Sequence, residues 1–543
     1  MANLHGAPTH DARRPGAGRR AVRSCGRAAA PALILVAILA VAACSDSGNG
    51  AADEEESAST PGPNPSEVRA ETGADVVLST AGDVVATVDE RYQSYNVEMV
   101  EVTGGEFWKP YDAGSGKVVR PPLDLSDERI RNLADALGPA YVRVSGSWAN
   151  ATYFDPDGQP GDAPPAGFGG VLTGDQWKGV GEFADAIDGK ILVSFAATDG
   201  VRDDQGAWQP DQARALLEFS LENDIPLVAA EFINEPGLPV NVPAGYDAAA
   251  YERDFQAFVE LVSEVMPDLV IVGPGATADE TPLVVSPSIT VDELMDASGS
   301  ALDVFSYHFY PNISERCGST ETAETVLTEE YLGRVGRARD FYAEKRDRYT
   351  PGAPMWITET AQAACGGDRW AAWFQDSIRY VDTLGRLARG DGDVVFHNTL
   401  AASDYALIDE DGLVPRGSYW AGVLWARLVG PRVLAVESSA DLADLTTYAH
   451  CAPSDEGSTT YVVVNASTTD TRTVATGNDP VTTYQLTGES LDSPTAMLNG
   501  EVLAAAEDGT LPALDGDEVD GAVTIPPASV TYIVDPTTNP ACS

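Results

Sequence analysis

Basic side chains are scarce in this chain. It carries 34 Lys and Arg against 83 Asp and Glu over 543 residues, a formal net charge of −49. So acidic a surface is a poor match for nucleic acid, for anionic lipid headgroups and for long sulfated polyanions. We therefore expect no nucleic-acid partner. The alternative explanation, that the negative charge only keeps the protein soluble, accounts for most of it.

A run of about 20 apolar residues, which a membrane-spanning helix needs, is also missing. The apolar run Pro31–Cys44 is shorter, follows several arginines, and is typical of a signal-peptide core, so we assign residues 1–43 to a signal. Its end, Val41-Ala-Ala-Cys44, resembles the bacterial lipobox, which implies that Cys44 is lipidated. The alternative is an ordinary secretion signal with Cys44 incidental. Either way we expect an exported protein that contacts a membrane only through an N-terminal lipid.

Cysteine and histidine are few, with six Cys and five His, and no Cys/His spacing indicates a metal site. Four cysteines follow Cys44, and an even number in an exported chain favours disulfides, with three pairings open. We expect the pairs Cys317–Cys365 and Cys451–Cys542.

Residues 44–73 are acidic and rich in Ser, Gly and Pro. Such a segment buries too little apolar surface to offset the entropy of folding, so we predict a disordered tether.

From residue 91 onwards, short β-rich runs alternate with amphipathic stretches. The predicted strands are Tyr92–Glu98, Ala140–Ser145, Lys190–Ala196, Leu227–Ile233, Leu269–Val272, Asp303–Phe309, Pro354–Thr358 and Asp393–Leu400. Eight strands, each followed by a helix, predict an α/β fold, a (β/α)₈ TIM barrel over residues 91–430. An open doubly wound sheet is the alternative, but no Gly-rich phosphate fingerprint follows the first strand.

The pattern changes after the last predicted barrel helix, Tyr419–Val429. Residues 431–543 contain short β-branched runs separated by Gly, Asp, Asn and Pro, which predict a C-terminal all-β sandwich. Residues 74–90 contain a predicted hairpin, Asp75–Val88, whose strands we expect to join the same sandwich.

Two glutamates end predicted strands four and seven, in Phe232-Ile-Asn-Glu-Pro236 and Met355-Trp-Ile-Thr-Glu-Thr360. Active sites of such barrels lie at this end of the strands. Retaining glycosidases need two carboxyl groups about 5–5.5 Å apart, one as acid/base and one as nucleophile. We interpret Glu235 as the acid/base and Glu359 as the nucleophile.

Strand alternation predicts which neighbours share a face with these glutamates. It places Glu231 and Ile233 with Glu235, and Ile357 with Glu359. Acidic side chains pointing into an apolar barrel are costly unless they have a chemical role or a partner.

The chain resembles the heparanase-like β-glucuronidases of glycoside hydrolase family 79, in clan A. The segments that carry the resemblance are Tyr141–Pro156, Ser306–Asn312, Trp356–Gly367 and Tyr419–Leu434. The resemblance implies a barrel with a β-sandwich, retention of anomeric configuration, and a β-linked glucuronic acid as the sugar cleaved. It implies no cofactor and no metal.

The same resemblance implies roles for residues around the two glutamates. Asn234 would bind the sugar 2-hydroxyl, and Arg143 would contact Glu359, although an ion pair with Glu231 is the alternative for Arg143. Independently of the resemblance, Tyr310 and His308, at the end of strand six, lie beside strand seven and are placed to steady Glu359 by hydrogen bonds. A structural histidine is the alternative for His308.

Binding of the uronic acid carboxylate is implied for the backbone N–H groups of Gly366 and Gly367 and for Tyr405. A simple turn and a packed aromatic are the alternatives for these positions. Cys365 departs from the family pattern, which has an aromatic residue there. Further sugar hydroxyls would contact Asn398 and Asn96, and Trp148 is either a platform for the sugar or a packed side chain.

We therefore expect a retaining β-glucuronidase that removes terminal glucuronate from a weakly charged glycan or glycoside. Another clan A activity, of xylanase or β-glucosidase type, is the second hypothesis. The third is a non-catalytic, sugar-binding surface lipoprotein.

Overall fold

The computed structural model describes residues 65–543, except 112–113, 115, 281–285, 454–456 and 479. The predicted signal peptide, the predicted lipidation site Cys44 and most of the predicted tether lie outside the described residues. Within the described ranges, the chain has no helix whose length and apolarity suit a membrane crossing.

The tether prediction is wrong for its last residues, which form helix α1 (Pro65–Thr72). Val68 is buried against Ala74, Val77 and Ala475, so the segment has an apolar anchor on the neighbouring strands. A compositional argument misses a single anchoring residue of this kind because it averages over the whole segment.

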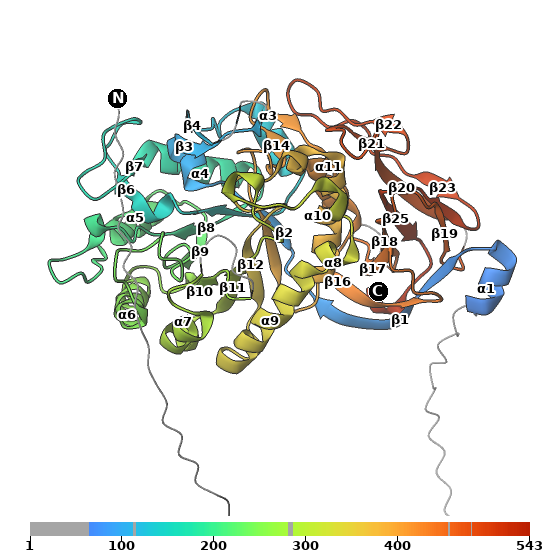
Figure 1. Ribbon diagram of the computed structural model, residues 1–543, viewed down its shortest axis with the longest axis horizontal. Helices are drawn as coiled ribbons and strands as arrows, with labels where there is room; N and C mark the ends of the chain where they lie inside the picture. The colour runs from blue at the N-terminus through green and yellow to red at the C-terminus, as the bar shows by residue number, and fades with distance from the viewer. Residues whose placement is uncertain (1–64, 112–113, 115, 281–285, 454–456, 479) are drawn as a thin grey trace, which may run out of the picture. The chain divides into compact units, whose positions relative to one another are not determined.

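A closed barrel of eight parallel strands forms the first part of the fold (Figure 1). The strands follow the predicted runs: β2 (Gln93–Asn96), β5 (Tyr141–Val144), β8 (Lys190–Ser194), β9 (Leu227–Glu231), β10 (Val270–Ala276), β11 (Val304–His308), β12 (Met355–Thr360) and β13 (Val394–His397). Their order around the barrel is β2-β5-β8-β9-β10-β11-β12-β13, closing on β2. The predicted barrel is therefore confirmed, and the doubly wound alternative is wrong.

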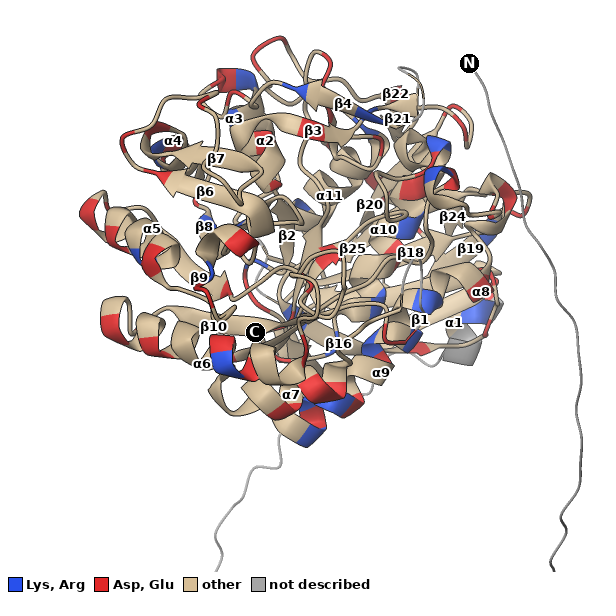
Figure 2. Cartoon of the chain, turned by 60° about the vertical axis from the view of Figure 1, so that its left-hand side comes forward, with Lys and Arg blue, Asp and Glu red and all other residues tan. Residues whose placement is uncertain are grey.

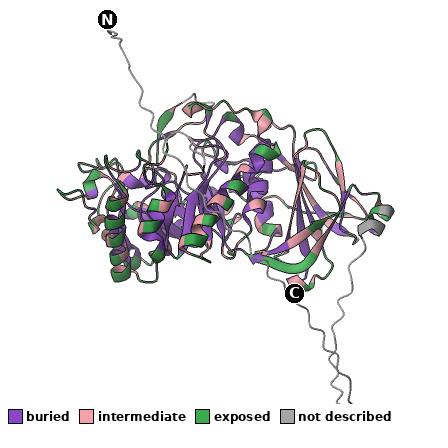
Figure 3. Cartoon of the chain, turned by 60° about the horizontal axis from the view of Figure 1, so that its bottom comes forward, coloured by how far each residue is buried: buried purple, intermediate pink, exposed green. Residues whose placement is uncertain are grey.

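Helices cover the outside of the barrel and turn their exposed faces to solvent (Figure 3). The main ones are α3 (Glu128–Asp135), α4 (Gly174–Ala186), α5 (Asp211–Glu222), α6 (Ala248–Val265), α7 (Val291–Ser298), α9 (Arg334–Tyr349), α10 (Phe374–Leu387) and α11 (Gly417–Leu428). Side-chain N-caps at Asp127, Thr173, Asp247 and Thr290 accept backbone N–H groups of the first turn, which fixes where four of them begin.

Four short strands above the barrel were not expected from the sequence. Strands β3 (Gly105–Trp108) and β4 (Lys117–Arg120) pair antiparallel, and β6 (Thr152–Asp155) and β7 (Gly170–Thr173) pair in parallel. They lie in the segments that follow β2 and β5, where loops of this fold carry function.

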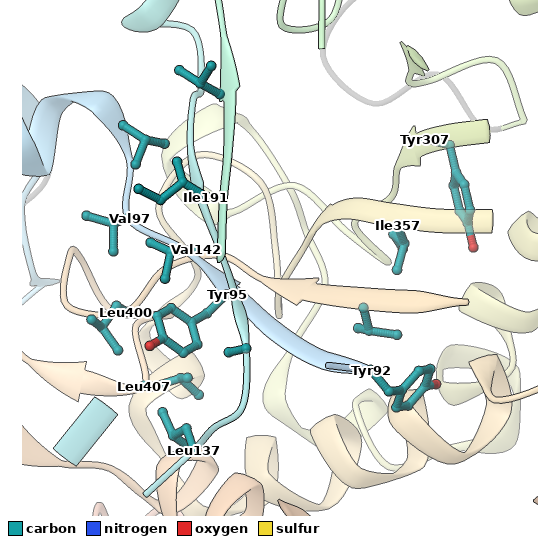
Figure 4. Close-up of a cluster of buried hydrophobic side chains, with 14 of the residues drawn as sticks. Tyr92, Tyr95, Val97, Leu137, Val142, Ile191, Tyr307, Ile357, Leu400 and Leu407 are labelled. Atoms are coloured by element: carbon teal, nitrogen blue, oxygen red, sulfur yellow. The ribbon is translucent and has the colours of Figure 1, made fainter. Parts of the chain in front are cut away.

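The prediction that Ile357 shares a face with Glu359 is wrong. Ile357 packs in the apolar cluster around Tyr92, Tyr95 and Tyr307 (Figure 4). The neighbouring Thr358 instead hydrogen-bonds into the barrel interior. The register of β12 against β13 shifts between Ile357 and Thr360, and such an irregularity lets two successive side chains reach one face.

The C-terminal part is an 11-stranded sheet of order β22-β21-β20-β25-β18-β17-β16-β1-β19-β24, with β23 beside β20. Its main strands are β16 (Arg432–Ser438), β17 (Leu445–Cys451), β18 (Thr459–Asn465), β19 (Arg472–Ala475), β20 (Val481–Gly488), β24 (Val523–Ile525) and β25 (Ser529–Asp535). Val474 and Ile525 from one end of the sheet are buried with Val463 and Ile533 from its middle, so the sheet closes over one core as a sandwich.

Residues 75–88 do not form the expected hairpin. They form one long strand, β1 (Val76–Thr87), which pairs antiparallel with β16 and, at its start, in parallel with β19. The register against β16 shifts on either side of Val84, and such irregularities bend a strand without ending it.

Candidate active site

A cavity of about 650 Å³ opens at the C-terminal ends of the barrel strands. Its lining includes six residues considered from the sequence as reacting with or contacting the sugar: Glu235, Glu359, Tyr310, Asn398, Tyr405 and Trp148. A concave site at this end of a TIM barrel is where the fold places chemistry.

The two glutamates meet across this cavity. Oxygens of Glu235 and Glu359 and a nitrogen of His308 all lie within 4.8 Å of one another. The spacing suits the retaining arrangement, since inverting enzymes hold their carboxyl groups about 6.5–9.5 Å apart. Both side chains are nearly buried, 13% and 11% exposed.

Glu235 is held by two neighbours. Asn241 donates from Nδ2 to Oε2 at 2.8 Å, and His308 Nδ1 lies 3.1 Å from Oε1. Arg143 Nη2 lies 3.2 Å from His308 Nε2, and a guanidinium can only donate, so this contact favours the tautomer that carries its proton on Nδ1. His308 thus donates to Glu235. The backbone of Glu235 has a φ of 48°, a left-handed conformation that is uncommon for a side chain of this kind.

Glu359 is surrounded by donors. Tyr310 Oη donates to Oε1 at 2.6 Å, Arg143 Nη1 donates to Oε2 at 3.3 Å, and His308 Nδ1 lies 3.5 Å from Oε2. Burial and the Glu359 charge raise the pKa of Tyr310 well above its ordinary value, so its hydroxyl remains a donor. Both oxygens of Glu359 therefore face hydrogen-bond donors, an arrangement that suits a carboxylate nucleophile.

Arg143 satisfies both roles considered for it. Its Nη2 forms an ion pair with Glu231 Oε2 at 2.7 Å, while Nη1 reaches Glu359. Glu231 Oε1 accepts from Ser306 at 2.9 Å and from Thr358 at 2.8 Å. Burial acts to raise the pKa of Glu231, but Arg143 and the hydroxyl donors outweigh it and hold the pKa below the ordinary value.

Asn234 and Asn96 lie behind the cavity rather than on its surface. The Asn234 Oδ1 accepts from Arg143 at 2.8 Å. Asn96 donates to Asn398 Oδ1 at 2.9 Å, and Asn398 in turn donates to Tyr310 Oη at 2.9 Å and Tyr405 Oη at 3.2 Å. The contacts of Asn96 therefore orient residues that line the cavity.

Gly366 and Gly367 do not line the cavity either. Gly367 already donates its N–H to Ala363 O at 3.2 Å. Gly366 has a φ of +81°, and a Cβ there would lie 2.4 Å from Trp108 Cβ, so glycine is needed for packing. In this geometry the pair does not offer the two free donors expected for a uronate, whereas Tyr405 does face the cavity.

Glu98 is a site residue that the sequence reasoning missed. It lines the cavity, is 3% exposed, and its Oε2 has no hydrogen-bond partner among the described residues. Burial and the nearby Glu359 raise the pKa of Glu98 well above its ordinary value. A Cβ at Gly146 would lie 1.6 Å from Oε2, so only glycine leaves room for this carboxyl. The signal was available, because Glu98 ends the first predicted strand as Glu235 ends the fourth.

The cluster of Glu235, His308 and Glu359 also has the donor spacing of a metal site. The Arg143 guanidinium contacts Glu359 and lies next to His308. Its permanent positive charge would repel a metal cation bound to the same side chains. The donor arrangement therefore fits proton transfer and nucleophilic attack better than metal binding.

Both predicted disulfides are confirmed, Cys317–Cys365 and Cys451–Cys542. The first joins the segments that follow β11 and β12, and Cys365 lines the cavity. The second joins β17 to the C-terminal end of the chain.

A parallel eight-stranded barrel with paired glutamates after its fourth and seventh strands defines a clan A glycosidase. The model of the glycosyl hydrolase family 79 N-terminal domain matches residues 117–385. This match, together with heparanase-like relatives along most of the chain, supports a heparanase-like protein of glycoside hydrolase family 79.

Similar proteins span most of the chain. Heparanase-like protein 1 of Arabidopsis thaliana is 24% identical, over 79% of this chain and 89% of the relative. Baicalin-beta-D-glucuronidase of Scutellaria baicalensis is 23% identical, over 83% of this chain and 89% of the relative. Inactive heparanase-2 of Mus musculus is 25% identical, over 67% of this chain and 64% of the relative. The GH51 arabinofuranosidase of Xanthomonas axonopodis pv. citri shares the fold, with a TM-score of 0.60 at 14% identity over 85% of this chain and 99% of that one.

Proposed function

We propose that this chain is a retaining β-glucuronidase that removes terminal β-linked glucuronate from a weakly charged glycan or glycoside. The observation that carries the proposal is the approach of Glu235 and Glu359 within one cavity. The similarity to a plant β-glucuronidase supports glucuronate as the sugar.

In the proposed reaction, Glu235 protonates the glycosidic oxygen while Glu359 attacks the anomeric carbon, so the aglycone leaves and a glycosyl ester forms on Glu359. Glu235, now a carboxylate, takes a proton from water as that water attacks the same carbon and displaces Glu359. Two inversions retain the β configuration. Arg143 and Tyr310 stabilise Glu359 as an anion before attack and after release.

The acidic surface supports a weakly charged substrate. Figure 2 colours several acidic residues red along α5 and α6. Lys117 is the sole Lys or Arg on the cavity lining within the described residues. A long sulfated chain would need several basic side chains to offset its charge.

The direct test compares 4-nitrophenyl β-glucuronide with the matching β-glucoside and β-xyloside. We expect release from the glucuronide alone, with the β anomer appearing first by NMR. Replacing Glu359 by Gln should lower kcat by about 10⁴-fold or more, and replacing Glu235 by about 10²–10⁴-fold. Glu222→Gln, on the exposed end of α5, is the matched control.

Other results favour the alternatives. Faster release from the glucoside or xyloside would assign another clan A activity. Absence of turnover on every substrate, with sugar binding intact in both wild type and Glu359→Gln, would indicate a non-catalytic binding protein.

We also propose that the protein is exported and held at the membrane by a lipid on Cys44. Palmitate labelling of the wild type but not of Cys44→Ser is the expected result. Equal labelling, or none in either, would leave an ordinary secretion signal as the better explanation.

A further inference from the structure

Lys117 places a cation in an otherwise acidic cavity. The charged residues on the cavity lining of the described chain are Lys117 and four glutamates, Glu98, Glu106, Glu235 and Glu359. The Lys117 Nζ lies 4.9 Å from the centre of the Trp108 ring and 5.0 Å from that of Trp148. Both indoles also line the cavity.

The position of Lys117 is built by local structure. Strands β3 and β4 pair antiparallel with Trp108 directly opposite Lys117, so the two side chains share one face. Trp108 packs over Gly366, where no Cβ would fit, and Trp148 packs on the buried Phe107 with ring centres 4.8 Å apart.

The aromatic wall is continuous with the floor of the active site. Phe107 belongs to a buried cluster with Tyr310 and Tyr405, against which Trp108 and Trp148 pack. A displacement of either tryptophan would disturb this cluster, so the indoles form a fixed surface beside the reacting carboxyls.

The Lys117 ammonium has no carboxylate within 4 Å among the ion pairs of the described residues, whereas Lys345 pairs with Asp292 at 2.7 Å. The two indole faces attract the cation but accept no conventional hydrogen bond. Its N–H donors therefore remain available for an anionic group that enters the cavity.

We propose that Trp108, Lys117 and Trp148 form a subsite that binds a carboxylate-bearing sugar, with the sugar ring against an indole and the carboxylate on the ammonium. The proposal rests on the proposed function and names a further recognition element for its substrate. The carboxylate belongs either to the glucuronyl residue itself or to an acidic residue joined to it. Both sources share the same chemistry.

The test measures kcat and KM for wild type, Lys117→Met and Lys117→Arg on two substrates, 4-nitrophenyl β-glucuronide and a β-glucuronide of a uronic acid. Lys117→Met should raise KM about 10-fold or more with kcat little changed, because a charge-assisted hydrogen bond to the substrate is lost. Lys117→Arg should recover most of the affinity. The control is Lys178→Met, which removes a lysine of α4 that lies over the Phe219 ring of α5 and does not line the cavity.

The two substrates separate the two sources of the carboxylate. An effect on both substrates assigns Lys117 to the glucuronyl carboxylate, and an effect confined to the second assigns it to the neighbouring acidic residue. Unchanged KM on both, or an equal loss with Lys178→Met, overturns the subsite.

A binding measurement keeps this test independent of catalysis. Calorimetric titration of Glu359→Gln with glucuronic acid, the acidic disaccharide and glucose should show binding of an acidic sugar that falls with added salt and with Lys117→Met. If the wild type hydrolyses nothing while this pattern holds, the proposed activity fails and the subsite stands. If acid binding is insensitive to Lys117→Met, the subsite fails whatever the activity.

Discussion

Arg143 forms its closest ion pair with Glu231, at 2.7 Å, in the centre of the barrel. Both side chains are essentially inaccessible to solvent, and the contact to Glu359 is longer, at 3.3 Å. Glu231 thus fixes the guanidinium from below, and Arg143 presents its remaining donors to the active site. Arg143 therefore belongs both to a buried ion pair of the barrel and to the set of donors that contact Glu359.

Removing Arg143 should cost both stability and activity. In Arg143→Met the Glu231 carboxylate is left buried without its cation, so we expect a loss of about 3–5 kcal/mol in the free energy of unfolding. Urea denaturation measures this loss. The double variant Arg143→Met/Glu231→Gln should regain much of the stability and yet keep a low kcat, since Glu359 still lacks the guanidinium donor. Full recovery of kcat in the double variant would show that Arg143 acts only on stability.

Tyr310 should matter for turnover more than for folding. Tyr310→Phe removes the hydroxyl that donates to Glu359 at 2.6 Å. The charge on Glu359 changes when this carboxylate attacks and leaves, so losing the donor should lower kcat about 10²-fold. Tyr95→Phe is a suitable control, since the hydroxyl of this buried tyrosine has no partner among the described residues. Steady-state kinetics and thermal unfolding of both variants check this. Equal kcat in the two variants would contradict it.

The fold and the reacting pair could be predicted because they depend on local patterns. Apolar runs separated by amphipathic segments specify the barrel, and carboxyls at strand ends mark its rim. Glu235 and Glu359 satisfy both conditions, and so does Glu98 at the end of the first predicted strand.

Other features depend on spatial packing that one sequence does not display. The inward turn of Glu359 requires a register shift in β12, and Lys117 reaches the cavity only because β3 and β4 pair above the barrel. The N–H of Gly367 is engaged by Ala363, four residues earlier, a local turn that resemblance to a family does not reveal.

The disulfide Cys317–Cys365 should support binding more than folding. It ties two loops of the catalytic rim together, and Cys365 lines the cavity, while the barrel below is closed by its own strands. We expect Cys317→Ser/Cys365→Ser to raise KM several-fold with a modest change in the midpoint of thermal unfolding. Cys451→Ser/Cys542→Ser, in the sandwich, should show the opposite pattern. Identical effects of the two double variants would argue against a local role.

Glu101 should make stability depend on pH. Its carboxyl is fully buried and accepts N–H groups from Glu98 at 2.7 Å and Ala401 at 3.1 Å, and burial raises its pKa to about 7. The native state therefore holds a proton that the unfolded chain releases near its ordinary pKa of 4.5. The resulting stabilisation is complete below that pH and is lost as pH rises through 7, by up to ~3 kcal/mol.

The test is the free energy of unfolding of Glu101→Gln from pH 5 to pH 8. Gln stays neutral, so the variant is less stable at pH 5, where it loses one acceptor, but its stability should fall less with pH than that of the wild type. Glu222→Gln, with its side chain in solvent, should follow the wild-type curve. Parallel curves for wild type and Glu101→Gln would mean that Glu101 does not titrate in this range. Convergence of the two curves towards pH 8 would show that ionisation of this one buried carboxyl lowers the free energy of unfolding.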